Sequence, residues 1–356
     1  MNKIICLKGD GIGPEIMDSS IKVLRSISKD FNFEYELLFE DFGGVSIDKH
    51  GEPFTNDLKE KLNNADAVLL ACIGSSKYDS APVRPEQGLL ELRKYLNLYA
   101  NIRPLKVSDS LLSLSPLKPE IVKGSDLVIV RELSSGIYFG EPRFYSDEEA
   151  YDTMRYNKKE ITRIVDYAFK IASKRNKKVT SVDKANVLAS SKLFRKISID
   201  VSKNYPDVTL EHRYVDAMAM ELITKPSSFD VIVTSNLFGD ILSDEASVLG
   251  GSLGLLASSS FSETGISLYE PAHGSAPDIA GLNIANPIAM ISSMSMMLRY
   301  SFDQDNLSNL IDDCIDRVLN EGYYTKDLDN ENYLSTTDWT NKLIEKIQEV
   351  KHEYII

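Results

Sequence analysis

Two aspartates one helical turn apart are the residues of this chain best placed to do chemistry. Asp240 and Asp244 lie in the run FDVIVTSNLFGDILSDEAS, directly after an apolar, β-branched segment at 229–234 that is typical of a buried parallel strand. A spacing of four puts both carboxylates on one helix face. Ligands of open α/β sheets bind at the carboxyl ends of such strands. Two hard oxygen donors there suit Mg²⁺ or Mn²⁺. The same pair could simply cap or solvate a helix start.

An arginine beside two leucines indicates a ligand that is both charged and branched. In EQGLLELR, the spacings of three, four and seven predict one helical stripe. A guanidinium next to apolar side chains suits a substrate with a carboxylate and a branched alkyl group. The stripe consists of Glu86, Leu89 or Leu90, and Arg93.

Other polar residues stand close to predicted strands. Arg103 precedes a proline and Arg131 ends the apolar run at 127–130, and both could bind carboxylates in the bidentate manner. Lys184 and Tyr138 could exchange protons as a general base and a general acid. Asp216 is an acid within an apolar stretch, which favours a charged partner such as a metal. Taken singly, each arginine is explained as a surface ion-pair partner, Lys184 as a solvated side chain and Tyr138 as a packing aromatic.

Two glycine-containing segments bear on nucleotide binding. The segment GDGIGPE at 9–15 fails the dinucleotide fingerprint because Ile16 takes the third glycine position, and a tight strand-to-helix connection explains it.

The loop EPAHGSAPDIAG at 270–281 is polar and rich in small residues. His273 could face an adenine ring, residues 274–276 could allow close backbone approach, and Asp278 could bind ribose hydroxyls while repelling a 2′-phosphate. A capped loop before a helix at Ile288 explains the same composition.

Composition and periodicity predict a globular α/β protein. Apolar runs at 4–7, 67–72, 127–130, 178–182 and 231–234 alternate with helical stretches, which predicts a mainly parallel sheet with helices on both faces. The net charge of −13 makes nucleic acid an unexpected partner, and no run of about 18 apolar residues or targeting segment is found, so we expect a cytoplasmic protein. The three cysteines are expected to be packing residues of a reducing compartment. Residues 136–154 predict a protruding two-stranded ribbon, either a dimer arm or a plain surface hairpin.

Together these segments resemble the isocitrate/isopropylmalate family of β-decarboxylating dehydrogenases, nearly from end to end. Within the family, Leu89 and Leu90 favour 3-isopropylmalate, because the isocitrate enzymes place a serine in this helix to meet a third carboxylate. The motifs are GDGIGPE from Gly9, RPEQGLLELRK from Arg84, NIRP from Asn101, VRELSSGIYFGEPR from Val130, SVDKANVL from Ser181, YPDV from Tyr205, YVDAMAM from Tyr214, SNLFGDILSDEAS from Ser235 and HGSAPDIAG from His273.

The resemblance implies a two-domain α/β fold with a parallel or mixed sheet that is not a Rossmann fold. The first domain would combine 1–98 with 251–356, and the second would span 99–250 with a dimer arm near 136–156. The active site would lie in a cleft and be shared across a homodimer. The resemblance assigns substrate binding to Arg93, Arg103, Arg131, Leu89, Leu90 and Glu86; catalysis to Lys184, Tyr138 and Asp216; metal binding to Asp240, Asp244 and the partner's Asp216; and cofactor binding to Ile12, His273, Gly274, Ser275, Ala276, Asp278 and Asn286.

The expected reaction is the NAD-dependent, Mg²⁺- or Mn²⁺-dependent oxidative decarboxylation of 3-isopropylmalate to 4-methyl-2-oxopentanoate in leucine biosynthesis. The alternatives are a relative acting on D-malate, tartrate, homoisocitrate or another 3-alkylmalate, and a non-catalytic regulatory binding subunit. One segment departs from the family: IGSSKYD at 73–79 stands where GGPKWD is common, which affects cofactor affinity more than the type of reaction.

Overall fold

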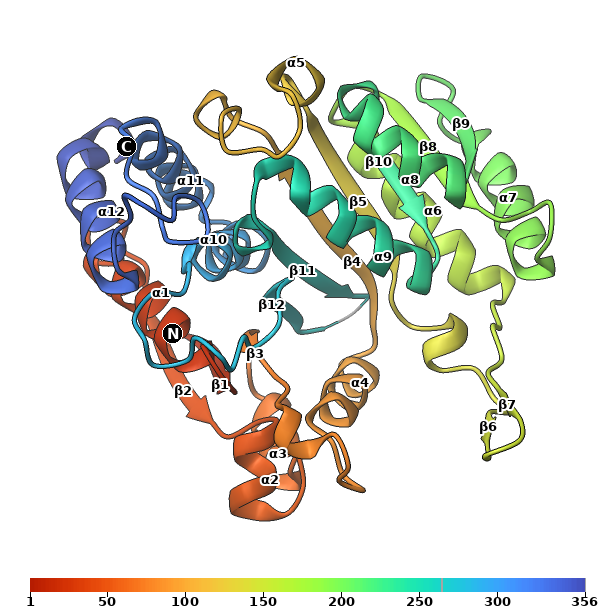
Figure 1. Cartoon of the computed structure of the whole chain (residues 1–356), viewed down its shortest axis with the longest axis horizontal. Coiled ribbons are helices and arrows are strands. Elements are labelled where there is room, and N and C mark those ends of the chain that lie inside the picture. The colour runs from red at the N-terminus through yellow and green to blue at the C-terminus, as the bar shows by residue number, and fades with distance from the viewer. Residues whose placement is uncertain (264, 356) are drawn as a thin grey trace. The chain divides into compact units, whose positions relative to one another are not determined.

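The computed structural model describes residues 1–263 and 265–355, which form two compact units (Figure 1). Unit 1 comprises residues 1–96, 109–114 and 252–356, and unit 2 comprises residues 97–108 and 115–251. The short piece at 109–114 contains η2 (Asp109–Leu111), which packs on a helix of unit 1, although the sequence placed it in the second domain.

The described residues of unit 1 form five strands, in the order β2-β1-β3-β12-β11. Pairing is parallel except between β11 and β12, which form an antiparallel pair. The central strand β3 is buried along its whole length, as its uninterrupted run AVLLAC predicts. The strands are β1 (Asn2–Gly9), β2 (Tyr35–Glu40), β3 (Ala67–Cys72), β11 (Ala257–Ser262) and β12 (Ser267–Pro271).

The helices of unit 1 build its core around α1 and α10, which pack on the strands and on each other. All the methionines of α10 are buried, because this helix is covered by β12, β11 and β3 and by its neighbour α11. Trp339 of α12 is fully buried and donates from its indole nitrogen to the carbonyl of Tyr323 at 3.0 Å. The helices are α1 (Gly13–Ile27), α2 (Gly44–His50), α3 (Asn56–Leu62), α4 (Pro85–Tyr95), α10 (Ile288–Phe302), α11 (Asp305–Asn320) and α12 (Thr336–Val350), with η1 (Ser76–Tyr78), η6 (Leu253–Leu255) and η7 (Lys351–Glu353).

Unit 2 contributes five strands to the main sheet, in the order β4-β5-β10-β8-β9. β4 is antiparallel to β5, and the remaining pairs are parallel. In this register Arg131 of β5 lies between Asn101 of β4 and Thr234 of β10. The strands are β4 (Leu98–Lys106), β5 (Asp126–Glu132), β8 (Lys178–Asp183), β9 (Thr209–Tyr214) and β10 (Val231–Thr234).

Two pairs of helices pack on these strands, α6 with α7 and α8 with α9. Asn157 and Glu160 begin α6 with a capping box. The elements are α5 (Pro119–Val122), α6 (Lys158–Ser173), α7 (Ala189–Ser202), α8 (Val215–Thr224), α9 (Asn236–Ser247), η3 (Gly136–Tyr138), η4 (Pro226–Ser228) and η5 (Val248–Gly250).

The predicted ribbon is confirmed as a two-stranded antiparallel pair that extends away from the rest of unit 2 (Figure 1). It is formed by β6 (Phe144–Tyr145) and β7 (Ala150–Tyr151). The side chains of Phe144, Tyr145 and Tyr151 are exposed, and the Phe144 and Tyr151 rings stack at 5.7 Å.

The predicted fold class is confirmed, and each of the five predicted strands is found, but β2, β4, β9, β11 and β12 were not predicted. All three cysteines are buried free thiols, as expected. None of the helices that the structure describes has the length and apolarity needed to cross a membrane.

Candidate functional site

The carboxylate pair and two of the predicted arginines come together in unit 2. The sheet register places Asn101, Arg103 and Arg131 on one sheet face, because residues two apart on a strand share a face and Arg131 pairs with Asn101. Helix α9 packs on β4 and β5 and presents Asp240 to both guanidinium groups. Arg131 Nη1 lies 2.5 Å from Asp240 Oδ1, and Arg103 Nη2 lies 3.5 Å from the same oxygen.

Arg103 and Arg131 are both buried, so the alternative that they are surface ion-pair partners is wrong. Arg131 is 1% exposed and Arg103 is 5% exposed. A buried guanidinium needs several partners to offset its lost hydration. Arg103 donates to Ser243 Oγ and to Asp244 Oδ1, the latter at 3.2 Å. These contacts hold two positive groups at one end of the strands, a suitable place for an acidic ligand.

Asn236, at the start of α9, joins Arg131 to the loop that carries Tyr138. Its Oδ1 accepts from Arg131 Nη2 at 2.8 Å and Nε at 3.1 Å, and its Nδ2 donates to the carbonyl of Ser135 at 3.0 Å. Tyr138 in turn donates to Asp240 Oδ2 at 2.7 Å. Gly239 lets the helix come this close, because a Cβ there would lie 2.6 Å from Arg131 Cγ. Sequence reasoning did not identify Asn236, which reads locally as an ordinary helix start.

Asp240 and Asp244 provide the donor chemistry of a divalent cation site. Although much of the Asp244 side chain is exposed, the packing around its carboxyl group raises its pKa; Arg103 opposes this effect, and the neighbouring Asp240 carboxylate adds to it. Such accumulated negative charge is what a cation would relieve. Among the described residues, however, no three His, Cys, Asp or Glu side chains are grouped as a metal would require. The two aspartates therefore fit part of a coordination shell.

Asp216 and Lys184 form a separate pair in unit 2. Lys184 follows β8, and its Nζ lies 2.6 Å from Asp216 Oδ1 at the start of α8. The hydrogen bond from Lys184 lowers the pKa of Asp216. Asp216 is exposed in the first turn of α8, and Lys184 is its charged partner within the unit.

The third arginine, Arg93, is in unit 1. It is 9% exposed, and its Nη2 donates to Glu270 Oε1 at 3.0 Å. Its Nε is buried and has no hydrogen-bond partner among the described residues. Leu89 and Leu90 are half-buried one turn earlier on α4, whereas Glu86 is exposed. A donor left unpaired in a buried position is costly, and a ligand carboxylate would satisfy it.

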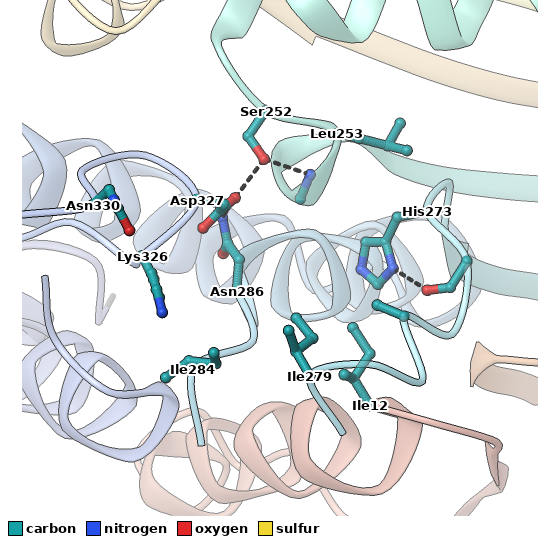
Figure 2. Close-up of a pocket in the computed structure, with 13 residues that line it drawn as sticks. Ile12, Ser252, Leu253, His273, Ile279, Ile284, Asn286, Lys326, Asp327 and Asn330 are labelled. Atoms are coloured by element: carbon teal, nitrogen blue, oxygen red, sulfur yellow. Dashed lines mark hydrogen bonds between the residues drawn. The ribbon is translucent and has the colours of Figure 1, made fainter. Parts of the chain in front are cut away.

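Unit 1 contains a cavity of about 480 Å³, lined mostly by apolar side chains and backbone (Figure 2). In Figure 2, Ile12 and Ile279 lie side by side, and Lys326 and Asn330 lie across the pocket from them. His273 Nδ1 is bonded to the carbonyl of Gly274 at 2.9 Å, and burial lowers the pKa of this histidine. The size and lining of the pocket suit part of a nucleotide. The lining residues are Ile12, Ser252, Leu253, Gly254, His273, Gly274, Ala276, Ile279, Ile284, Asn286, Lys326, Asp327 and Asn330.

Two predicted cofactor residues lie outside this lining. Ser275 is buried; its hydroxyl donates to the carbonyl of Gly74 at 2.6 Å, and its carbonyl accepts from the amide of Ile12 at 2.8 Å. Gly11 permits this contact, since a Cβ there would lie 2.0 Å from the Ser275 carbonyl oxygen. Asp278 is exposed. Ser275 therefore shapes the pocket wall by holding the opening glycine turn against the late loop.

The segment that departs from the family pattern is fixed to α2 in unit 1. The Tyr78 hydroxyl lies 2.8 Å from both the carbonyl of Gly44 and Asp48 Oδ1, and Lys77 Nζ lies 2.6 Å from the same Asp48 oxygen. Asp10 accepts from the Gly74 amide at 3.0 Å. The tyrosine and lysine thus supply local contacts that keep this segment ordered.

This chain belongs to the isocitrate/isopropylmalate dehydrogenase family, which it matches over residues 3–343. Among solved structures, an isocitrate dehydrogenase from Methylococcus capsulatus is 34% identical, with a TM-score of 0.87 over 98% of this chain and 100% of that one. A β-decarboxylating dehydrogenase from Thermococcus kodakarensis, in its apo form, is 33% identical, with a TM-score of 0.82 over 99% and 98%.

Curated relatives with more similar sequences carry the name 3-isopropylmalate dehydrogenase. The protein of that name from Listeria innocua is 57% identical over 346 residues, which cover 97% of this chain and 98% of the relative. The one from Streptococcus thermophilus is 55% identical over 345 residues, covering 97% and 99%.

Proposed function

We propose that this protein catalyses the NAD-dependent oxidative decarboxylation of 3-isopropylmalate to 4-methyl-2-oxopentanoate, a step of leucine biosynthesis. The single observation that carries the proposal is the 57% identity, over 97% of the chain, to a relative named 3-isopropylmalate dehydrogenase. The site chemistry agrees with it, because the substrate has two carboxylates, a hydroxyl group and a branched alkyl group. A biosynthetic enzyme of this kind would act in the cytoplasm.

The arginines would bind the two carboxylates of the substrate. Arg93 offers a buried Nε that lacks a partner among the described residues, and Arg103 and Arg131 present buried guanidinium groups beside Asp240. Guanidinium groups bind carboxylates with defined orientation as well as affinity. The half-buried Leu89 and Leu90 would contact the isopropyl group.

Asp240 and Asp244 would hold Mg²⁺ or Mn²⁺, with Asp216 of a second copy of the chain as a further ligand. When bound, the metal would supply Lewis-acid chemistry that favours negative charge on the substrate oxygen as CO₂ departs. Lys184 of the same second copy, which is paired with that Asp216, would take the proton of the C2 hydroxyl as the hydride is lost to the nicotinamide. Tyr138, held by Asp240 at 2.7 Å, would deliver a proton to the carbon left by decarboxylation.

The pocket of unit 1 would receive the cofactor, with His273, Asn286 and Ile12 among its contacts. We propose NAD⁺ rather than NADP⁺, since Asp327 lines the pocket and Asp278 lies on the loop that forms one wall, and both carboxylates would disfavour an additional phosphate. The exposed aromatic ribbon of β6 and β7 would serve as a dimer arm, because exposed aromatic side chains of this kind are typical of protein interfaces.

The test is NADH formation with 3-isopropylmalate, isocitrate, D-malate and tartrate, each with Mn²⁺ and each with excess EDTA. The proposal predicts the highest kcat/KM for 3-isopropylmalate and no turnover in EDTA. Equal or higher efficiency with isocitrate would overturn the choice of substrate and leave only the family.

A further inference from the structure

Tyr214 is the last residue of β9 and lies beside Lys184, the proposed proton acceptor. The parallel register pairs Tyr214 with Asp183, the residue before Lys184. Helix α8 begins directly after Tyr214, and this brings Asp216 to 2.6 Å from Lys184 Nζ. Sequence reasoning quoted Tyr214 only as the first residue of the segment YVDAMAM. Its side chain is 38% exposed, so Tyr214 is not a core residue, and its neighbours are charged groups.

The Tyr214 ring lies close to two cations of unit 2. Lys184 Nζ is 5.8 Å from the ring centre, and Arg195 Cζ is 4.9 Å from it. A cation within about 6 Å of a ring centre is attracted by the negative face of the ring. Because a lysine ammonium ends a flexible four-carbon stem, this contact reduces the positions that it can adopt. The ring and the Asp216 carboxylate therefore restrain the same ammonium together.

The backbone around Lys184 is held separately from the ring. Asp183 is 1% exposed, and its carboxylate accepts from the Ala185 amide at 2.8 Å and from Arg195 Nε and Nη2, both at 2.9 Å. The Lys184 amide donates to Ser191 Oγ at 3.0 Å. Since these bonds fix the main chain on both sides of the lysine, loss of the aromatic ring would release the lysine side chain alone.

We propose that Tyr214 is a positioning residue whose ring holds the Lys184 ammonium of its own chain where this group can exchange the proton of the C2 hydroxyl, an inference that rests on the proposed function. A proton acceptor that moves away from the reacting atom slows the step without loosening the substrate. Loss of the ring should therefore lower kcat and leave KM for 3-isopropylmalate nearly unchanged. The role belongs to the ring, so phenylalanine should replace tyrosine.

Steady-state NADH formation with 3-isopropylmalate, at low and at saturating Mn²⁺, would compare wild type with Tyr214→Phe and Tyr214→Leu. The matched control is Tyr323→Leu, because Tyr323 is a half-buried residue of unit 1 with Lys342 Nζ 4.7 Å from its ring centre, and it is not among the pocket-lining residues. We expect kcat to fall about fivefold in Tyr214→Leu at both Mn²⁺ concentrations. KM should stay within about twofold of wild type. Tyr214→Phe and Tyr323→Leu should match wild type.

Acetylation of lysines measures the same restraint without turnover. Brief treatment with an acetylating reagent, followed by peptide mass spectrometry, gives the modification rate of Lys184 relative to Lys203. The side chain of Lys184 is 27% exposed and that of Lys203 is 69% exposed, so Lys203 is a reference that the ring does not cover. Tyr214→Leu should raise the relative rate of Lys184 about threefold, and Tyr214→Phe should leave it unchanged.

Four results would overturn the proposal: wild-type kcat in Tyr214→Leu, equal losses in both Tyr214 variants, unchanged Lys184 acetylation, or a loss of kcat that disappears at saturating Mn²⁺. The last result would mean that the ring acts through the metal ligand Asp216. Failure of the proposed function gives a different result, because wild type would then form no NADH with any malate. The acetylation rates would still decide whether the ring restrains Lys184.

Discussion

Replacement of Asn236 by alanine should destabilise unit 2 and weaken substrate binding together. The asparagine side chain is 1% exposed and makes three hydrogen bonds, two from the Arg131 guanidinium and one to the carbonyl of Ser135. Losing a buried hydrogen bond to a charged group costs about 1.5–3 kcal/mol and a neutral one about 1 kcal/mol. Because the backbone carbonyl of Asn236 still accepts from Arg131 Nε at 2.9 Å, we expect a total loss of about 2–4 kcal/mol.

Urea unfolding followed by circular dichroism, at fixed protein concentration, measures this loss as a lower transition midpoint. Asn204→Ala is the control, since it removes the same atoms from an exposed position in unit 2 and should cost less than about 0.5 kcal/mol. Steady-state kinetics should show a raised KM for the malate substrate in Asn236→Ala alone. A midpoint equal to that of Asn204→Ala would refute the reasoning, because the buried network would then contribute nothing.

Four further predictions concern the site residues and the buried thiols. Leu89→Ser or Leu90→Ser should reduce kcat/KM for 3-isopropylmalate about tenfold or more while affecting D-malate less; equal losses on both substrates would reject the leucine pocket. Asp240→Asn should remove most turnover and weaken Mn²⁺ binding measured by calorimetry, with an unchanged circular dichroism spectrum, and undiminished Mn²⁺ affinity would exclude the metal role. Burial lowers the pKa of His273, so below about pH 6.5 the unfolded chain binds a proton that the native state does not. The free energy of unfolding should therefore fall as the pH is lowered from about 7 to about 5.5, and it should fall less steeply in His273→Gln. The same pH dependence of the unfolding free energy in wild type and His273→Gln would contradict this. All three thiols are buried, and burial raises the pKa of Cys6 to about 12, so a thiol reagent should label none in the native protein and three in urea.

The strands that sequence reasoning identified share one property: their apolar content. The run AVLLAC of β3 and the run VIVT of β10 are buried on both faces and leave a continuous apolar pattern. The missed strands lack it. β11 reads ASSSFS, and its buried serines are the three that pair with β12, Ser258, Ser259 and Ser260. β9 reads TLEHRY, and its charged residues are half-exposed at the edge of the sheet.

The site residues fall into two similar groups, those that a local sequence pattern reveals and those that it does not. The Asp240 and Asp244 pair and the Arg93 stripe are local spacings on single helices, so the sequence reveals them directly. The role of Asn236 and the place of Lys326 in the pocket lining depend on contacts between distant segments. Asn236 meets Arg131 because β10 pairs with β5 in a register that places Thr234 beside Arg131. Lys326 reads as an ordinary surface lysine until the chain brings it to the wall of a pocket formed by much earlier segments.

Product analysis tests the central claim most directly. Wild-type protein would be incubated with 3-isopropylmalate, NAD⁺ and Mn²⁺, and NADH, CO₂ and 4-methyl-2-oxopentanoate would be quantified together. The proposed function predicts that the three products appear in equal amounts and that none appears when Mn²⁺ is replaced by EDTA. NADH without CO₂, or no NADH with this substrate while another malate is oxidised, would contradict it.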